Sequence, residues 1–260
     1  MPTPTFVPGD PCWADLMTDD VEGAKKFYGE LLGWTFEGSD EETYGGYVTA
    51  YKDGKQVAGI MAKQPDQAQM PSTWSIYLQS TDAEATSAAI TEAGGNVFVP
   101  PMTVPEMGVM AIAEDPSGAV IGVWEPLGHT GYQLVNETGS VGWHELNSRG
   151  YDAAVEFYRK AFGWETSVME DTPEFRYTTL GEGESARAGI FDADAFLPEG
   201  VPSHWQIFLV VDDADAAVKQ IVDNGGSVLR EPWNDPHGRH AHVADPQGAP
   251  FMLHQSLPQG

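Results

Sequence analysis

Residues 27–34 read Phe-Tyr-Gly-Glu-Leu-Leu-Gly-Trp, and residues 157–164 read Phe-Tyr-Arg-Lys-Ala-Phe-Gly-Trp. Both segments begin with a Phe-Tyr pair and end in Gly-Trp, and they lie 130 residues apart. The same offset relates Asp-Pro-Ser-Gly-Ala at 115–119 to Asp-Pro-Gln-Gly-Ala at 245–249. Because one offset links unrelated local sequences, the chain is predicted to be a tandem duplication.

A weaker repeat lies inside each copy. Trp13 and Trp74 are 61 residues apart, and Trp143 and Trp205 are 62 apart, so each copy is predicted to hold two modules. The segment between the copies, 128–139, has few apolar residues and three glycines, which is typical of a linker. The predicted units are a first domain at 1–128 with modules at about 10–63 and 72–126, and a second domain at 139–260 with modules at about 140–193 and 203–256.

The residue pattern predicts the same order of elements in each module. Residues 74–78 and 205–211 are rich in aromatic and β-branched residues, which favours strands. Apolar residues recur on one face of a helix over 21–32, the segment 18–20 offers N-cap side chains, and Gly33 suits the left-handed residue after a helix. Short strands follow, and the Asp-Pro-x-Gly sequences fit type I turns between the last two. Each module is therefore predicted to be strand–helix–strand–strand–strand.

The composition limits the function. The chain has 260 residues, 13 basic and 39 acidic side chains, and a formal net charge of −26. Nucleic acids and anionic membranes bind basic surfaces, so neither is an expected partner. The acidity favours solubility, with attraction of a cationic ligand as the alternative. The chain has one cysteine, no apolar run of membrane-spanning length and no signal-peptide pattern at its start, so we expect a soluble, cytoplasmic protein.

The paired modules, the Phe-Tyr helix and the Asp-Pro-x-Gly hairpin together resemble the vicinal-oxygen-chelate (glyoxalase/bleomycin-resistance/dioxygenase) superfamily over nearly the whole chain. A closer resemblance is to a group of two-domain actinobacterial glyoxalase-like proteins and hydroxylases, and it is carried by segments 13–16, 134–139 and 143–146. That group includes a mycobacterial culture-filtrate antigen and accessory proteins of anthracycline pathways. The resemblance implies an α+β fold of tandem domains, in which four βαβββ modules with curved mixed sheets form cups. It does not settle the chemistry, because the superfamily holds lyases, dioxygenases, thiol transferases and drug binders.

Metal-using members of that superfamily take one ligand from the first strand and one from the last strand of each module, commonly His or Glu. An indole offers only an N–H donor and glycine has no side chain, so the residues found at these positions are poor ligands for a divalent ion. No metal or other cofactor is therefore predicted. The matching positions are Trp13, Gly59, Ser75 and Gly122 in the first copy and Trp143, Gly189, Gln206 and Met252 in the second.

A divalent metal at a shifted site is the alternative. Strand residues two apart share a face, so Glu145, His204 and His254 share the faces of three of those positions and could form a facial triad. The other interpretation is that they are polar residues at strand ends or cup rims. His240 and His242 also share a face, and they could be zinc ligands, ligand contacts, or rim or core residues.

Large aromatic and sulfur-containing side chains occupy the predicted cup faces instead. Such a wall favours a flat hydrophobic ligand through burial and ring stacking, and an indole face could also hold a cationic group. The alternative is that these side chains fill the cups as core. The proline- and methionine-containing segment 99–108 and its counterpart 231–238 are predicted as loops, with a lid as one interpretation. The candidate ligand-binding residues are Trp13, Tyr77, Trp124, Trp143, Gln206, Phe208 and Met252, and no catalytic residue is identified.

Three functions fit these features. The leading interpretation is metal-independent binding of a hydrophobic aromatic small molecule, for natural-product sequestration, self-resistance or as an accessory to a biosynthetic enzyme, which would then be a second partner. The alternative is a glyoxalase-like lyase or a hydroxylase/dioxygenase-type enzyme with a divalent metal at the shifted site. A structural or interaction protein with filled cups is the third.

Overall fold

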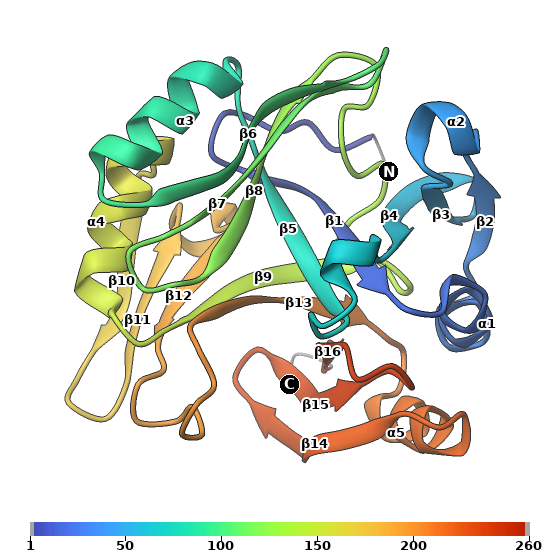
Figure 1. The fold of residues 1–260 in the computed structure, drawn as a ribbon. Helices are drawn as coiled ribbons and strands as arrows, with labels where there is room; N and C mark the ends of the chain where they lie inside the picture. Colours follow the sequence, from blue (N-terminus) through green and yellow to red (C-terminus); the bar gives the residue numbers. More distant parts are fainter. Residues whose placement is uncertain (1–2, 258–260) are drawn as a thin grey trace.

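The computed structural model describes residues 3–257; residues 1–2 and 258–260, at the outer ends of the two predicted domains, lie outside the described residues. Two eight-stranded mixed sheets make up most of the fold (Figure 1). The strands of the first sheet all precede residue 127, and those of the second all follow residue 140, so each copy of the repeated sequence forms its own sheet. The predicted α+β fold of four βαβββ modules is confirmed.

The first sheet has the strand order β2-β3-β4-β1-β5-β8-β7-β6. Its two modules join where β1 pairs antiparallel with β5, and within each module the first strand pairs parallel with the last. The strands are β1 (Pro11–Thr18), β2 (Thr35–Gly38), β3 (Val48–Lys52), β4 (Lys55–Ala62), β5 (Thr73–Gln79), β6 (Asn96–Val104), β7 (Gly108–Glu114) and β8 (Val120–Pro126).

The second sheet repeats this arrangement in the order β10-β11-β12-β9-β13-β16-β15-β14. Here β9 pairs antiparallel with β13 at the junction of the modules. The strands are β9 (Val141–Ser148), β10 (Thr166–Asp171), β11 (Arg176–Leu180), β12 (Ala188–Asp192), β13 (His204–Val210), β14 (Ser227–Asp235), β15 (Gly238–Ala244) and β16 (Pro250–Gln255).

One helix follows the first strand of each module, as predicted. Local sequence fixes its ends: the Asp20 side chain accepts a hydrogen bond from Gly23 N before the first helix, and Gly33 ends that helix with φ 70°. A short helix in the first module and two 3-10 turns are additions to the predicted pattern. The helices are α1 (Val21–Leu32), α2 (Glu41–Tyr44), α3 (Ala83–Glu92), α4 (Tyr151–Phe162) and α5 (Ala214–Asp223), and the 3-10 turns are Pro65–Gln67 and Gly183–Ser185.

Strand alternation gives each sheet a helix-covered face and an opposite face, which we call its cup. On β5, Trp74 lies on the helix face, where its Nε1 donates to the hydroxyl of Tyr28 on α1 at 3.2 Å, so Tyr77 lies on the cup face. The side chains that define the N-terminal cup are Trp13, Asp15, Tyr47, Tyr77 and Trp124. The side chains that define the C-terminal cup are Trp143, Glu145, Tyr177, Gln206, Phe208 and Met252.

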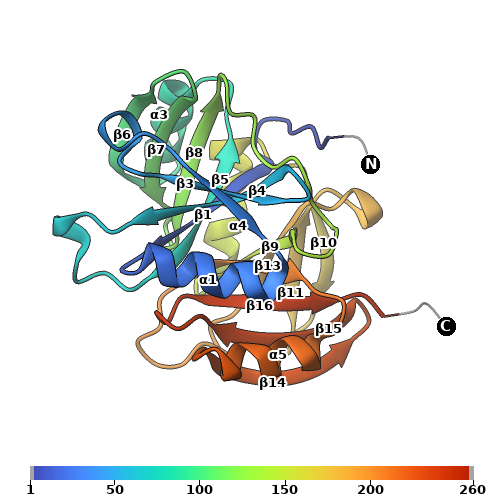
Figure 2. The same ribbon diagram turned by 90° about the vertical axis from the view of Figure 1, so that its right-hand side faces the viewer.

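The two domains pack through their helix faces. The ring of Tyr28 on α1 lies 5.7 Å from that of Phe251 on β16, and one continuous hydrophobic core includes buried residues of both sheets. Helix α3 lies beside α4, and α1 lies beside α5 (Figures 1 and 2). Because the helix faces form the interface, the two cups face away from each other.

The segments predicted as loops near 99–108 and 231–238 are edge strands instead. Residues 99–104 belong to β6 and residues 231–235 to β14, and each strand forms a tight hairpin with its neighbour. Proline is tolerated there because an edge strand has a side without ladder partners. These segments therefore form a wall of each cup and not a lid.

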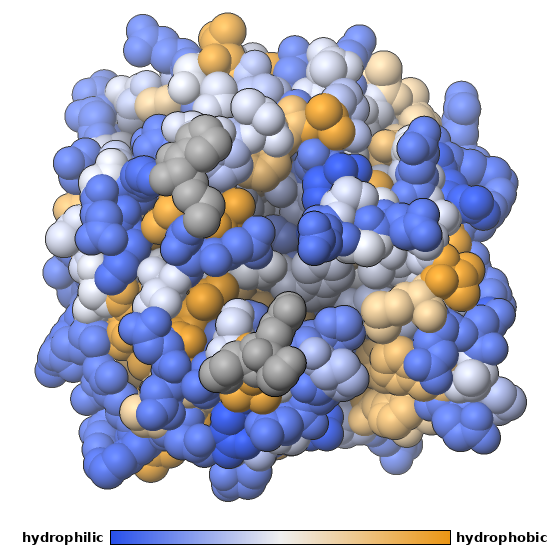
Figure 3. Space-filling model, turned by 180° about the vertical axis from the view of Figure 1, so that it is seen from behind, coloured by the Kyte–Doolittle hydropathy of each residue, from blue (hydrophilic) through white to orange (hydrophobic). Residues whose placement is uncertain are grey.

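The face of the molecule seen in Figure 3 is predominantly hydrophilic, in keeping with the net charge of −26, and the apolar side chains on it form separate patches. Among the residues that the structure describes, no helix has the length and apolar character needed to cross a membrane.

Candidate functional site

A hydrogen-bonded chain of three side chains forms the floor of the N-terminal cup. Trp13 Nε1 donates to the Tyr47 hydroxyl at 2.8 Å, and that hydroxyl lies 3.4 Å from Asp15 Oδ2, to which it donates. Trp13 and Asp15 are two residues apart on β1, so they share the cup face, and Tyr47 reaches them from the start of β3. Each polar group in this chain uses its hydrogen to bind the next one.

The C-terminal cup contains the same chain with a longer carboxylic side chain. Trp143 Nε1 donates to the Tyr177 hydroxyl at 2.9 Å, and the Tyr177 hydroxyl donates to Glu145 Oε2 at 2.8 Å. Gln206 Nε2 donates to the other carboxyl oxygen of Glu145 at 3.0 Å. Both oxygens of Glu145 therefore already accept hydrogen bonds within the protein.

Glycines make room for the two tyrosines. A Cβ atom on Gly59 would lie 1.7 Å from the Tyr47 hydroxyl oxygen, and a Cβ atom on Gly189 would lie 2.0 Å from that of Tyr177. Both contacts are far shorter than a van der Waals contact, so any larger residue would displace the tyrosine. Glycine is needed at these positions because a tyrosine from the neighbouring strand fills the space above it.

Burial raises the pKa of both carboxyl groups. Desolvation is the largest cause for Asp15, whose pKa rises to about 7, and it is opposed by hydrogen bonds from Tyr77 and Tyr47. Desolvation also raises the pKa of Glu145, against hydrogen bonds from Tyr177 and Gln206. A carboxyl group with a raised pKa in a concave site is a feature of binding and catalytic sites.

The linker after β8 closes the N-terminal cup. The His129 ring packs edge-on against Trp13, with ring centroids 4.3 Å apart, and the His129 carbonyl accepts a hydrogen bond from Trp124 Nε1 at 2.8 Å. Tyr132 is 1% exposed, lies 5.3 Å from Trp13 between ring centroids, and places its hydroxyl 3.0 Å from His144 Nε2 of the second domain. The N-terminal cup is thus filled by the protein's own side chains.

The C-terminal cup is less closed. Trp143 and Glu145 are half-buried, whereas their counterparts in the first domain are buried. Trp143, Phe208 and Met252 are neighbours in one row across β9, β13 and β16, and the Phe208 ring lies 5.8 Å from that of His240 on β15. Phe208 and Met252 are 8% and 4% exposed, so this aromatic and sulfur-containing wall meets solvent at the half-buried Trp143.

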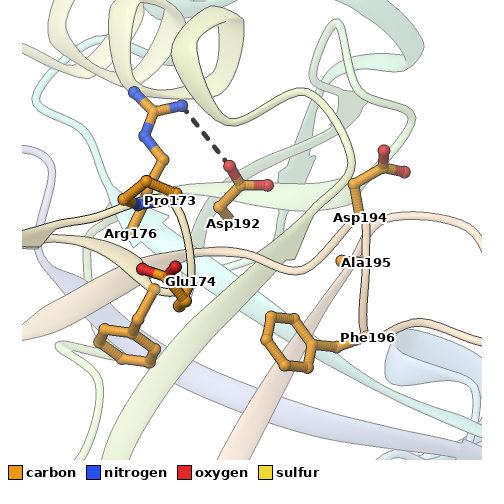
Figure 4. A pocket seen from close by; sticks show the side chains of 8 residues that line it. Pro173, Glu174, Arg176, Asp192, Asp194, Ala195 and Phe196 are labelled. Carbon is orange, nitrogen blue, oxygen red and sulfur yellow. Dashed lines mark hydrogen bonds and ion pairs between the residues drawn. The ribbon is translucent and has the colours of Figure 1, made fainter.

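A surface hollow of about 480 Å³ lies at the rim of the C-terminal cup. Phe175 in its lining stacks on Tyr177 of the cup floor, with parallel rings whose centroids are 5.9 Å apart. Figure 4 shows Glu174 and Phe196 on opposite sides of this hollow, with the ion pair of Arg176 and Asp192 above them in the view. A second hollow, of about 410 Å³, lies beside the linker and is lined by Lys52, Asp53, Lys55, Leu134, Glu137 and Thr138.

The side chains present do not fit a metal ion at the superfamily's usual positions. Gly59 and Gly189 are covered by tyrosine hydroxyls at distances that leave no space for a ligand side chain. A Cβ atom on Gly122 would lie 2.2 Å from the ring of Tyr77, so that position is filled in the same way. Indole and thioether side chains at Trp143 and Met252 complete a donor set that suits no hard divalent cation.

The proposed shifted triad is not assembled. Among residues 3–257, no group of three or more His, Cys, Asp or Glu side chains could hold a metal ion. Glu145 is engaged by Tyr177 and Gln206, while His204 Nδ1 lies 2.9 Å from the Pro202 carbonyl. His254 packs against His240 instead, with ring centroids 5.0 Å apart.

The structure divides the seven predicted ligand-binding residues between the two cups. Trp13, Tyr77 and Trp124 lie in the closed N-terminal cup, whereas Trp143, Gln206, Phe208 and Met252 lie in the C-terminal cup. Sequence reasoning missed Tyr47, Tyr177, Asn147, His129 and Tyr132. The repeat itself could have identified the first two, because Tyr47 and Tyr177 are also 130 residues apart.

Two cup-bearing βαβββ domains with paired first strands define the class of protein. The chain belongs to the Glyoxalase/Bleomycin resistance protein/Dioxygenase superfamily, whose pattern matches residues 12–123 and again residues 134–253. It is similar to CFP32 of Mycobacterium bovis, named as a proposed glyoxylase, with 37% identity over 96% of each chain. It is also similar to the anthracycline biosynthesis protein DnrV of Streptomyces peucetius, with 36% identity over 95% of this chain and 94% of DnrV.

Solved structures of enzymes share the fold at low sequence identity. The Mn(II)-bound glyoxalase of Novosphingobium aromaticivorans aligns with a TM-score of 0.63 and 17% identity, over 95% of this chain and 82% of that one. The 2,3-dioxygenase LapB of Pseudomonas sp. KL28 aligns with a TM-score of 0.64 and 15% identity, over 97% of this chain and 94% of that one. At this identity the likeness establishes the fold and leaves the chemistry to the site.

Proposed function

We propose that the C-terminal cup binds a hydrophobic aromatic small molecule without a metal ion, and that the protein serves as an accessory to a biosynthetic enzyme or sequesters a natural product for self-protection. The observation that carries this proposal is the hydrogen-bonded floor of Trp143, Tyr177 and Glu145. The Tyr177 hydroxyl fills the space above Gly189, so no metal-ligating side chain fits there.

The wall chemistry supports an aromatic ligand. Trp143, Phe208 and Met252 present a continuous apolar and polarisable surface, and Phe175 and Phe191 extend it toward the rim, with ring centroids 5.3 Å apart. Flat rings bury area against such a surface and gain from offset or edge-on packing. Concave apolar sites with a few polar groups are the usual form of small-molecule sites.

The relatives' names support a role in natural-product pathways. DnrV and the similar protein DauV of Streptomyces sp. strain C5 are anthracycline biosynthesis proteins. Anthracyclines are fused-ring aromatic compounds, which is the shape that the wall favours. An accessory protein that binds such a compound would hold it away from water or relieve product inhibition of the enzyme that makes it.

Equilibrium dialysis with 1,4-dihydroxyanthraquinone as the probe tests this proposal on the full chain after treatment with EDTA. We expect binding that EDTA does not weaken. Trp143→Leu should weaken it about tenfold or more, since an indole face is lost, whereas the matched variant Trp13→Leu in the closed cup should leave it within about twofold. Binding that requires added Mn²⁺ or Fe²⁺, and that is lost in Glu145→Ala, would instead support the metal-dependent enzyme.

A further inference from the structure

Three buried nitrogen atoms in the C-terminal domain lack a hydrogen-bond partner among the residues that the structure describes. They are Asn147 Nδ2, His240 Nδ1 and His242 Nε2. Asn147 is 7% exposed and His240 is 5% exposed, whereas the His242 side chain is half-buried with its Nε2 atom covered. An unpaired buried polar group is destabilising, and native proteins keep few of them.

All three side chains point to the same cup. Asn147 is two residues from Glu145 on β9 and lies between Phe191 on β12 and His204 on β13. His240 and His242 are two residues apart on β15. His240 contacts the ring of Phe208, which places both histidines on the cup face opposite the phenylalanine-lined rim.

The N-terminal cup has no such polar groups at the matching positions. The repeat pairs Asn147 with Met17, His240 with Met110, and His242 with Ile112. Strand pairing confirms the correspondence, because Met110 and Ile112 face Trp124 and Gly122 just as His240 and His242 face His254 and Met252. These three side chains therefore belong to the C-terminal cup, whereas the unpaired buried atoms of the N-terminal cup are Asp15 Oδ1 and His129 Nε2.

The polarity of the three nitrogens indicates what they recognise. Burial lowers the pKa of His242 to about 4 and lowers that of His240, so both rings are neutral near neutral pH. His240 Nε2 donates to Asp235 Oδ1 at 3.2 Å, so its Nδ1 is left as an acceptor. The Asn147 amide nitrogen is a donor, and the neutral His242 can act in either sense.

A cationic side chain already lies at the rim beside these histidines. The guanidinium of Arg230 lies 3.8 Å from the centre of the Trp233 ring, and Arg230 pairs with His242 across β14 and β15. The indole face of Trp233 is thus already covered by a cation.

We propose that the C-terminal cup recognises the oxygen substituents of a phenolic aromatic ligand, with the Asn147 amide donating to an oxygen, His240 Nδ1 accepting a hydroxyl hydrogen, and His242 Nε2 accepting from a hydroxyl or donating to a carbonyl. This inference rests on the proposed function and specifies its ligand as a hydroxylated aromatic ring. A phenol both donates and accepts, as this mixed set of groups requires.

Isothermal titration calorimetry with three probes of similar size tests the proposal: 1-naphthol, 1-methylnaphthalene and 1-naphthylmethylammonium. We expect the full chain to bind 1-naphthol about tenfold more tightly than 1-methylnaphthalene, as one or two neutral hydrogen bonds would give. In the variant Asn147→Met, His240→Met, His242→Ile, which copies the N-terminal cup, that preference should fall to about twofold while 1-methylnaphthalene binding changes little. Met110→His in the closed cup is the matched control and should keep the preference.

Equal binding of 1-naphthol and 1-methylnaphthalene by the natural chain would overturn the proposal and leave aromatic binding in place. Tighter binding of the ammonium probe, or a preference that survives the triple substitution, would overturn it too. Failure of all three probes to bind would remove the proposed function on which it rests. If the triple variant does not fold, by near-ultraviolet circular dichroism, the three affinities of the natural chain still decide the matter.

Discussion

The Tyr28 hydroxyl donates a hydrogen bond to Asp245 Oδ2 across the domain interface, at 3.1 Å. The Tyr158 hydroxyl donates to Asp115 Oδ2 at the same distance, so the contact is made twice, in opposite directions. The other oxygen of each aspartate holds the hairpin turn that follows, as when Asp245 Oδ1 accepts from Gln247 N at 2.9 Å. The two most conspicuous repeated motifs therefore contact each other across the domain interface: the Phe-Tyr helix of one domain binds the Asp-Pro-x-Gly turn of the other.

Removal of these hydroxyls should loosen the interface. Tyr28→Phe leaves a buried carboxyl oxygen of Asp245 without its donor, and the expected loss in the free energy of unfolding is about 1.5–3 kcal/mol. Urea denaturation of the single variants and of Tyr28→Phe with Tyr158→Phe measures this loss. Tyr44→Phe is the control, because the Tyr44 hydroxyl makes only an exposed contact with the Pro105 carbonyl. Equal stability of the two single variants at positions 28 and 44 would show that the interface does not depend on this bond.

We expect Tyr177 to need the space above Gly189. Gly189→Ala places a methyl group 2.0 Å from the Tyr177 hydroxyl oxygen, and overpacking of this kind costs about 1–3 kcal/mol. Tyr177→Ala removes the clash, so the double variant should be less destabilised than the sum of the two single changes. Gly38→Ala, with no heavy atom within 4 Å of its new methyl group, is the control. Additive effects in this double-mutant cycle would mean that the tyrosine does not fill the site.

The raised pKa of Asp15 predicts a pH dependence. Its pKa of about 7 in the folded chain exceeds the value of a free aspartate, so between about pH 4 and pH 7 the folded state holds a proton that the unfolded state has lost. The contribution of Asp15 to the free energy of unfolding is therefore most favourable at low pH, and it falls as the pH rises to 7. Relative to the natural chain, Asp15→Asn should gain up to about 1.4 kcal/mol per pH unit across this range. Asp53→Asn, which removes the same charge at an exposed turn, serves as the control; identical pH profiles for the two variants would contradict the assignment.

Local signals explain which parts of the fold the sequence could predict. The helix at 21–32 follows from its apolar spacing and from the Asp20 side chain that caps it, and both operate within a few residues. The repeat offset extends that prediction to the second domain. The Tyr28–Asp245 bond joins residues 217 positions apart, and no local pattern indicates such a contact.

The state of each cup also depends on distant contacts. His129 and Tyr132 lie in the segment predicted as a linker, and only the folded chain brings them onto Trp13. The sequence predicts the aromatic residues of the N-terminal cup as ligand contacts, and the linker side chains that pack on Trp13 become evident only in the fold. The sequence does not indicate Asn147 as a candidate site residue, because its unpaired amide becomes evident only once its neighbours are known.

Native mass spectrometry of the EDTA-treated full chain with 1,4-dihydroxyanthraquinone decides whether the protein binds an aromatic ligand without a metal ion, since it weighs ligand and metal in one spectrum. We expect one ligand per chain, because the linker fills the N-terminal cup, with no added mass from a metal ion. A ligand adduct that forms only when a stoichiometric divalent ion is also bound would contradict it.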